Sequence, residues 1–199
     1  IDKIFNKKTK MKVFSWKGDR DTIMSPNDSI RYYKYFLRSG LLSIEPQTGH
    51  IKAWVGGINN KHFKYDAVAQ QKRQVGSTFK PFVYATAINQ LRRSPCDMLP
   101  NTPYTIPAGK YGIPEPWTPE NSNQKYGGML TLKDGLAGSV NTISARLIDE
   151  VGPENVVRLA KAAGIETEIQ ANPSIALGAV DLSLYEMVSA YSTFANKGL

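Results

Sequence analysis

The spacing of hydrophobic positions along the chain predicts a strand-rich beginning followed mainly by helices. Residues 41–45 and 51–55 are two apolar runs joined by a short link that contains Pro46 and Gly49, a pattern typical of a β-hairpin. Apolar positions at helical spacing predict helices further along, at 77–91, 131–138, 142–151, 153–163 and 183–196. A hairpin followed by helices indicates an α+β fold, with a helical layer on an antiparallel sheet.

The segment before this hairpin carries weaker signals. Residues 12–16 predict a strand with a turn after it. Ser25 as N-cap, Pro26 at the first helical position and Asp28 two residues later predict the start of a helix. That helix is expected to reach Gly40 and to present one apolar face, made of Ile30, Tyr33, Phe36 and Leu37.

Residues 92–128 are rich in Pro, Asn, Gly and Tyr. A segment of this length is too long for a passive connection between two helices. It therefore predicts a structured loop region over a site.

Composition places the chain among ordinary globular proteins and gives it a basic character. The chain has 199 residues, of which 41% are apolar and 21% charged, and its formal net charge is +8. The excess is concentrated near the start, at Lys3, Lys7, Lys8, Lys10, Lys12 and Lys17. Such a run is most often a solvated face, and a surface toward anionic lipid or polymer is the functional alternative. The sequence lacks the aromatic and basic motifs of nucleic-acid binders, so we expect no nucleic acid as partner.

Cysteine, histidine and hydropathy add three expectations. Cys96 is the single cysteine, so no internal disulfide forms, and it lies far from His50 and His62, which predicts no metal site. No apolar run approaches the ~20 residues that span a bilayer. The chain begins with Ile1 rather than Met, so we expect it to be a piece of a longer protein, with any anchor or export signal in the part before it.

One candidate for chemistry is the Ser-x-x-Lys sequence formed by Ser77 and Lys80 at the opening of the predicted helix 77–91. Residues three apart share a helix face, with Cβ atoms ~5–6 Å apart, so the amine can reach the hydroxyl. The free N–H groups at a helix N-terminus also favour an oxyanion. The structural alternative is an N-cap serine with a solvated lysine one turn later. Ser122 and Lys125 match the same pattern in a polar loop, where we expect no chemistry.

A second candidate is the Ser-x-Asn sequence formed by Ser139 and Asn141. It lies between two predicted helices, where a short loop exposes both polar side chains. The alternative role for Ser139 is the N-cap of the 142–151 helix. Ser25 and Asn27 match the same pattern, but there we assign the serine to a helix cap.

Together the two sequences resemble the motif set of penicillin-binding proteins and serine β-lactamases, which is Ser-x-x-Lys, Ser-x-Asn and Lys-Thr-Gly. The stretch from Arg73 to Phe82 closely resembles the nucleophile segment of class A penicillin-binding proteins. Further similar stretches occur in the family's order, at 45–57, 117–121, 176–178 and 191–198. The resemblance implies the transpeptidase fold of this family, with residues 1–39 as the linker of penicillin-binding protein 1A-type enzymes and 40–199 as the N-terminal part of the transpeptidase domain.

The chain departs from the family pattern in one respect. It contains no Lys-Thr-Gly or Lys-Ser-Gly sequence, since Thr48-Gly49 follows Gln47. In the family this box lies on a later strand, which supplies a cleft wall, a cation and half of the oxyanion hole. We therefore expect the chain to be truncated before the C-terminal strands and to be inactive alone.

The resemblance implies acyl transfer without a cofactor. Ser77 would attack the carbonyl between the two terminal D-alanines of a stem peptide, and an amine of a neighbouring stem peptide would then take the acyl group. Lys80 would be the base, which requires a pKa well below the usual ~10.4, through burial and a second cation. Ser139 would relay a proton, and Asn141 would bind Lys80 or the substrate amide. His50 and His62 give no persuasive Ser-His-Asp alternative.

The resemblance also implies partners and location. These are peptidoglycan stem peptides, lipid-linked glycan strands and β-lactams, on the periplasmic side of the bacterial inner membrane, with an anchored glycosyltransferase domain before the linker. Three rival functions remain open at this point. One is a β-lactamase or D-alanyl carboxypeptidase, with water as acceptor, another is a non-catalytic binding module of the same fold, and the last is a basic nucleic-acid binder.

Overall fold

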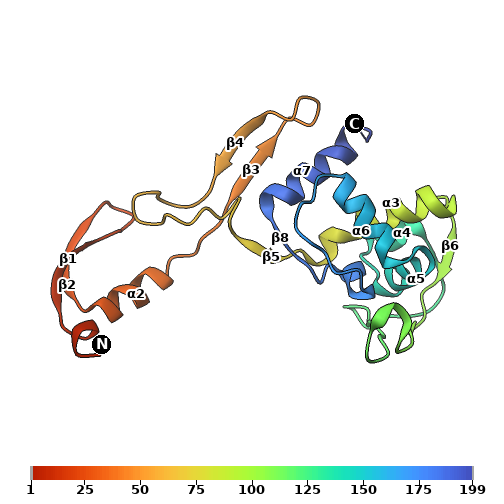
Figure 1. Cartoon of the computed structure of the whole chain (residues 1–199), viewed down its shortest axis with the longest axis horizontal. Helices are drawn as coiled ribbons and strands as arrows, with labels where there is room; N and C mark the ends of the chain where they lie inside the picture. The colour runs from red at the N-terminus through yellow and green to blue at the C-terminus, as the bar shows by residue number, and fades with distance from the viewer. Residues whose placement is uncertain (1, 199) are drawn as a thin grey trace.

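The computed structural model describes residues 2–198 and shows an elongated molecule (Figure 1). One end holds α1 (Asp2–Phe5), β1 (Thr9–Val13), β2 (Arg20–Met24) and α2 (Pro26–Lys34). A hairpin of β3 (Leu41–Ile44) and β4 (Ile51–Val55) projects between this end and a helical body. The helical body is formed by η1 (Gly76–Phe79), α3 (Lys80–Leu91), α4 (Leu132–Ala137), α5 (Asn141–Val151), α6 (Pro153–Ala162), η3 (Pro173–Leu177) and α7 (Leu184–Ala195).

The strands pair antiparallel, as predicted, and the α+β class is confirmed. Within the described residues, however, they form four separate two-stranded sheets rather than one continuous sheet. Two of these pairs, β1–β2 and β3–β4, are hairpins. The other two join distant parts of the chain: β5 (Lys72–Gln74) with β8 (Asp181–Ser183), and β6 (Met98–Pro100) with β7 (Met129–Thr131).

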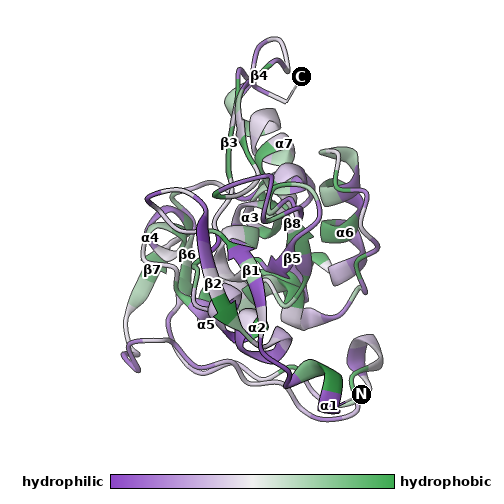
Figure 2. Ribbon diagram, turned by 90° about the vertical axis from the view of Figure 1, so that its left-hand side faces the viewer, coloured by the Kyte–Doolittle hydropathy of each residue, from purple (hydrophilic) through white to green (hydrophobic). Residues whose placement is uncertain are grey.

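The core lies in the helical body, where apolar side chains of α3, α5 and α6 meet. Phe79, Phe82, Ile143, Leu147 and Val156 are fully buried there. In Figure 2 the ribbon of α6 carries hydrophobic stretches, whereas β1 is largely hydrophilic. The predicted helices are all present, but the first one is divided, because a turn of 3-10 helix, η1, precedes α3.

At the N-terminal end the structure differs from two expectations, one on a strand and one on a helix face. The predicted strand 12–16 is wrong in part, because β1 ends at Val13 and contains only Lys12 and Val13 of that prediction. Phe14 leaves the ladder: its N–H donates to the Tyr33 hydroxyl at 3.1 Å, and its carbonyl accepts from the Tyr32 hydroxyl at 2.7 Å. The predicted apolar helix face is also wrong in part, since α2 ends at Lys34 and the predicted face positions Ile30 and Leu37 are 48% and 91% exposed. The capping box at the start of α2 is confirmed.

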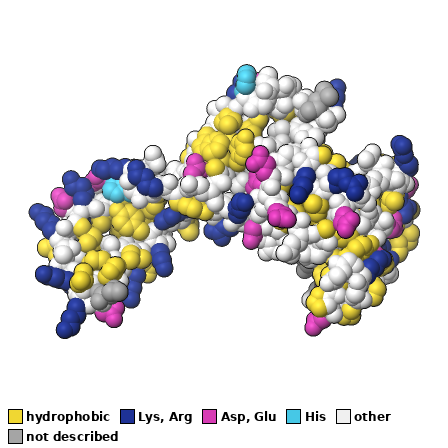
Figure 3. Space-filling model, in the orientation of Figure 1, with side chains coloured by type: hydrophobic (Ala, Val, Ile, Leu, Met, Phe, Trp, Pro, Cys, Tyr) yellow, Lys and Arg dark blue, Asp and Glu magenta, His cyan; other side chains and the backbone are white. Residues whose placement is uncertain are grey.

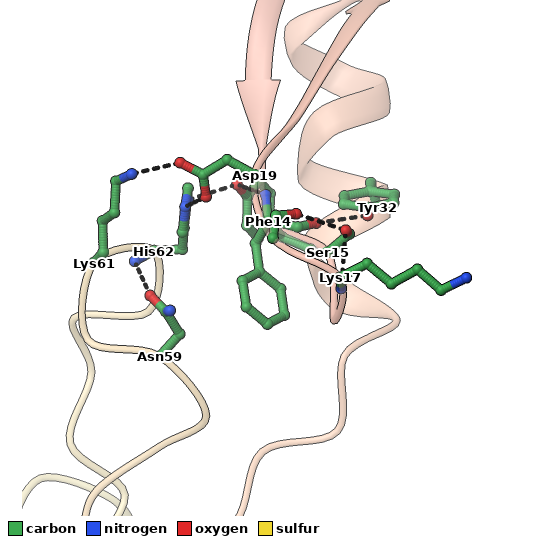
Figure 4. Close-up of polar contacts among 10 residues, drawn as sticks. Phe14, Ser15, Lys17, Asp19, Tyr32, Asn59, Lys61 and His62 are labelled. Carbon is green, nitrogen blue, oxygen red and sulfur yellow. Dashed lines mark hydrogen bonds and ion pairs between the residues drawn. The ribbon is translucent and has the colours of Figure 1, made fainter.

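An aromatic cluster joins this end to the loop that follows β4. Phe14 packs edge-to-face against Phe36 and Phe63, with ring centroids 5.2 and 5.3 Å apart. At its border Asp19 accepts from His62 Nε2 at 2.7 Å and pairs with Lys61 (Figure 4). Figure 3 shows lysine and arginine side chains around the rim of the same end. Residues 57–66 therefore fold back onto the N-terminal module, here defined as residues 2–37.

The long connection after α3 is structured, as predicted. It contains β6, the turn η2 (Lys110–Gly112) and a paired bridge between Ile106 and Trp117. Ile106 is fully buried against the core. This anchoring places the residues after Trp117 beside the start of α5.

Candidate active site

Ser77 lies on η1, in the turn that leads from β5 into α3 (Figure 1). Gly76 supplies the positive φ of +57° that this turn requires. Phe79 is buried behind the turn, while Ser77 itself is exposed. Within residues 2–198 the Ser77 hydroxyl has no hydrogen-bond partner, and the Ser77 carbonyl accepts from the Lys80 N–H. The hydroxyl is therefore presented at the surface, at the N-terminal end of a helix.

Lys80 is buried, with 1% of its surface exposed, although its side chain is cationic at neutral pH. Its Nζ donates to the Ser139 carbonyl at 2.6 Å, the Ser139 hydroxyl at 3.0 Å and the Asn141 Oδ1 at 2.7 Å. No carboxylate of the described residues forms an ion pair with it. Burial lowers the pKa of Lys80 from 10.5 to about 8. A lysine held only by neutral oxygens is thus brought toward the pH range in which it gives up its proton.

Ser139 lies between α4 and α5 in a left-handed conformation, with φ of +51°. The alternative role of N-cap is wrong, because the N-cap of α5 is Val140, which makes no side-chain cap. The tight turn is fixed by Ser139 N–H to Leu136 O at 3.0 Å and Val140 N–H to Gly135 O at 2.8 Å. A non-glycine residue at positive φ is strained, and here the strain turns both oxygens of Ser139 toward Lys80.

Asn141 is held from two sides. Its Oδ1 accepts from Lys80, and its Nδ2 donates to the carbonyl of Glu120 at 2.7 Å. Its backbone N–H donates to Asn121 Oδ1 at 3.0 Å. These contacts fix the orientation of the Asn141 amide, with the oxygen toward the lysine.

Asn121 and Asn101 form a buried support that sequence reasoning missed. The Asn121 side chain also accepts from the N–H of Thr142 at 3.2 Å and donates to Asn101 Oδ1 at 2.8 Å. Asn101 in turn accepts from the Thr142 hydroxyl at 2.8 Å. A fully satisfied buried network of this kind rigidifies its surroundings. The 117–121 stretch contributed to the family resemblance, but its spacing gave no sign of this role.

Gly178 supports the other side of Ser77, and this role too was missed. The Gly76 N–H donates to the Gly178 carbonyl at 3.1 Å, next to the β5–β8 pair. A Cβ on Gly178 would lie 1.8 Å from the Gly76 oxygen, so only glycine fits. The Tyr191 hydroxyl of α7 donates to the Thr78 carbonyl at 2.6 Å. The turn that carries Ser77 is therefore clamped by residues from the end of the chain.

The structure thus brings Lys80, Ser139 and Asn141 into direct contact, with Ser77 one turn before Lys80. The second matches to the Ser-x-x-Lys and Ser-x-Asn patterns lie elsewhere. Ser122 and Lys125 are on an exposed turn, and Ser25 caps α2. His62 pairs with Asp19 and with the Tyr33 hydroxyl in the N-terminal module, away from Ser77. Within residues 2–198 no cluster of His, Cys, Asp and Glu side chains could hold a metal ion, and no helix has the length and apolarity to cross a bilayer.

Comparisons with known proteins identify the family of the chain. Residues 1–37 match the family described as penicillin-binding protein middle domain, and residues 40–199 match the penicillin binding protein transpeptidase domain. Penicillin-binding protein 1A of Neisseria flavescens is 32% identical over 183 residues, which cover 92% of this chain and 22% of that protein. The chain therefore spans about a fifth of the length of the curated relatives it matches.

Solved structures show the same fold. The crystal structure of penicillin-binding protein 1A from Haemophilus influenzae matches with a TM-score of 0.73 and 32% identity, over 79% of this chain and 23% of that one. PonA1 from Mycobacterium tuberculosis in complex with penicillin V matches with a TM-score of 0.67 and 25% identity, over 85% of this chain and 47% of that one. Since the match to the transpeptidase family extends from residue 40 to residue 199, this chain belongs to the penicillin-binding protein transpeptidase family.

Proposed function

We propose that the chain is part of a peptidoglycan D,D-transpeptidase that works through an acyl-enzyme on Ser77. The Ser77 oxygen attacks the carbonyl between the two terminal D-alanines of a donor stem peptide, and the terminal D-alanine leaves with a proton on its amine. An amine of a second stem peptide then attacks the ester, forms the cross-linking amide and returns the serine hydroxyl. β-Lactams acylate the same oxygen. Penicillin V bound to the similar PonA1 protein supports this part of the proposal.

The observation that carries the proposal is the environment of Lys80. A serine hydroxyl becomes a good nucleophile when a neighbouring base takes its proton. Lys80 is buried without a counter-charge, and the lowering of its pKa to about 8 makes the neutral amine accessible near physiological pH. Burial is the cause of this lowering among the described residues, and the second cation expected from the sequence would lower the pKa of Lys80 further.

Ser139 and Asn141 complete the set. The Ser139 hydroxyl lies 3.0 Å from the lysine Nζ and relays the proton from Lys80 to the leaving amine. Asn141 keeps the lysine in place through its Oδ1 and binds the substrate amide. Asn141 donates hydrogen bonds to Asn121 Oδ1 and to the Glu120 carbonyl, and these bonds hold this loop in a single orientation.

We further propose that residues 1–39 form a linker and residues 40–199 the N-terminal part of the transpeptidase domain. In this proposal the parent protein carries a membrane-anchored glycosyltransferase domain, acts on lipid-linked glycan strands and stem peptides, and faces the periplasm. The 199-residue chain, which has no Lys-Thr-Gly sequence, does not turn over by itself.

The test is labelling of the full-length protein with a fluorescent penicillin. We expect covalent labelling of the wild type and none of Ser77→Ala. Ser122→Ala is the matched control, because Ser122 lies in the other Ser-x-x-Lys sequence and should label like the wild type. Equal labelling of Ser77→Ala and wild type would refute the assignment of the nucleophile.

A further inference from the structure

A cavity of about 630 Å³ lies where the chain after α2 meets β5, the strand that leads into the helical body (Figure 1). Residues 33–38 line one side of it, and Tyr65 with residues 71–73 line the other. None of the four predicted site residues lines it. A ligand bound here would therefore not occupy the acylation site.

The lining of this cavity is cationic. Four of its side chains carry a positive charge, and no carboxylate of the described residues lines it: Lys34, Arg38, Lys72 and Arg73. Within residues 2–198 none of the four forms an ion pair, whereas the exposed Lys61 pairs with Asp19. Like charges around one hollow repel one another, so an anion that enters it is attracted by all of them.

Neutral groups hold the two arginines in place. The Arg38 guanidinium lies over the ring of Phe63, with its carbon 5.1 Å from the ring centroid. The Gln71 amide, with its oxygen toward Arg73, accepts from Arg73 Nε at 2.5 Å and from Nη2 at 2.8 Å. These contacts orient both cations without neutralising them. Side chains that are already ordered lose less freedom when an anion binds.

The two lysines are held less firmly. Lys72 Nζ donates to Thr167 Oγ1 at 2.8 Å, which leaves two of its three N–H groups for a ligand. The Lys34 side chain makes no hydrogen bond within residues 2–198. Its place at the C-terminal end of α2 also suits the helix dipole without any ligand. That alternative does not account for Arg38 and Arg73, which lie outside the helices.

The size and the remaining walls of the cavity indicate which anion fits. Its volume falls within the ~300–1,000 Å³ of small-molecule sites, and Tyr33, Phe36 and Tyr65 supply aromatic surface for an organic group. Guanidinium groups bind phosphate oxygens in pairs. A phosphate group also concentrates negative charge at one point, whereas an acidic peptide spreads its carboxylates along a chain.

We propose that this cavity binds an organic phosphate, with Arg38 and Arg73 as its main partners and Lys34 and Lys72 as further cations. A phosphate held from both sides fastens the N-terminal module to β5 without covalent chemistry. The phosphate belongs either to a soluble ester or to a lipid headgroup. This site goes beyond acyl transfer at Ser77 and does not depend on it.

The experiment measures binding of inorganic pyrophosphate to the full-length protein by calorimetry, at constant ionic strength and without divalent cations. We expect Arg38→Gln and Arg73→Gln each to weaken binding by about tenfold, the effect of removing one hydrogen-bonded charge. Arg31→Gln on α2 and Arg158→Gln on α6 are the matched controls. Each removes the same charge from an exposed position outside the cavity, and both should bind like the wild type.

Lys34→Gln tests the site without disturbing an internal contact. It should weaken pyrophosphate binding by about threefold and leave the melting temperature of the free protein unchanged. Absence of pyrophosphate binding, or equal binding by wild type, Arg38→Gln and Arg73→Gln, overturns the site. An equal loss in the two control variants also overturns it, because the anion would then respond only to net charge.

The source of the phosphate is tested by competition. If the site takes a lipid headgroup, soluble dihexanoyl phosphatidylglycerol displaces pyrophosphate, dihexanoyl phosphatidylcholine does not, and Leu37→Ser weakens the displacement, since Leu37 is 91% exposed and lines the cavity. If neither lipid displaces pyrophosphate, the site takes a soluble ester. Tighter binding of hexaglutamate than of pyrophosphate, lost in Arg38→Gln and Arg73→Gln, would overturn the phosphate and assign the cavity to an acidic peptide.

Discussion

Lys80, in the helical body, and Lys61, in the loop that folds back onto the N-terminal module, hold their positive charges in very different surroundings. Lys80 is 1% exposed and is held by three neutral oxygens. The Lys61 side chain is 68% exposed and pairs with the carboxylate of Asp19. A lysine beside a carboxylate keeps its proton, whereas a lysine buried among neutral oxygens is pushed to release it.

The comparison separates a contact that stabilises from a contact that serves chemistry. The Asp19 cluster with Lys61 and His62 closes the loop 57–66 over an aromatic cluster (Figure 4). The Lys80 cluster buries a charge without a partner of opposite sign, an arrangement that costs stability and that a fold without a use for it would avoid. Perturbed titration in a supported cluster is typical of functional sites.

Removal of the two amines should give the largest contrast. We expect Lys80→Ala to lower the rate of acylation by penicillin by ~10²- to 10⁴-fold, because the base is lost. Lys61→Ala should leave that rate unchanged, since its amine contacts only the N-terminal module. Stopped-flow acylation of the full-length protein measures both. Similar rates for wild type and Lys80→Ala would remove the base from the mechanism.

The next largest effect should come from Gly178→Ala. The new methyl group would overlap the Gly76 carbonyl and displace the turn that carries Ser77. We expect a loss of about 3 kcal/mol in stability and a marked fall in acylation rate. The matched control is Gly49→Ala in the β3–β4 turn, because both glycines have φ of +72° but the Gly49 position has open space around it. Calorimetry and labelling of both variants test the clash apart from the backbone strain. Equal behaviour of the two variants would mean that the clamp on Gly76 does not position Ser77.

Lys80 and Gly178 also show which parts of the site could be predicted from the sequence and which could not. The placement of Ser77 and Lys80 one turn apart follows from the sequence, because residues three apart on a helix are neighbours whatever the rest of the chain does. The capping box at Ser25 and the β3–β4 hairpin were predictable for the same reason, since each depends on a few adjacent residues. The bonds from the Lys80 amine to Ser139 and Asn141, rather than to the Ser77 hydroxyl, do not follow from the sequence. The contact between Gly178 and Gly76 joins distant parts of the chain, and no local pattern encodes it.

The wrong predictions have the same origin, which is contacts between residues far apart in the sequence. The end of β1 was misplaced because Val13 and Phe14 are both buried, which breaks the alternation of a strand, and Phe14 bonds to tyrosines of α2 instead. Ile30 and Leu37 followed helical spacing but stay exposed, since the aromatic cluster is built by Tyr32, Tyr33 and Phe36. The support of Asn141 by Asn121 depends on the path of the loop from 92 to 128, which spacing alone does not determine.

The pH dependence of acylation sharpens the comparison further. Because burial lowers the pKa of Lys80 to about 8, the neutral base is a minority at pH 7 and dominates above pH 8. We expect the acylation rate to rise about tenfold per pH unit up to about 7.5 and to level off above about 8.5. Ser139→Ala should be slower at every pH, yet its rate should rise with a similar midpoint, because the desolvation of Lys80 remains. A flat profile between pH 6 and 9 would contradict a lysine base.

The smallest effect is expected on the other side of the comparison, from Asp19→Asn. Hydrogen bonds from Lys61 and then His62 lower the pKa of Asp19 below its ordinary value of 3.8. A carboxyl group with a lowered pKa stabilises the folded state above its unfolded pKa and loses that contribution as the pH falls through the folded value. At pH 7 we therefore expect Asp19→Asn to melt slightly below the wild type, as is usual for an exposed pair. This difference should begin to shrink as the pH falls below 3.8 and should vanish once the pH is below the lowered pKa of the folded state. Penicillin acylation should be unchanged, because Asp19 contacts only the loop 57–66 and the N-terminal module. A change in acylation rate as large as that of Lys80→Ala would show that the two regions are coupled, and the contrast between a stabilising and a chemical lysine would fail.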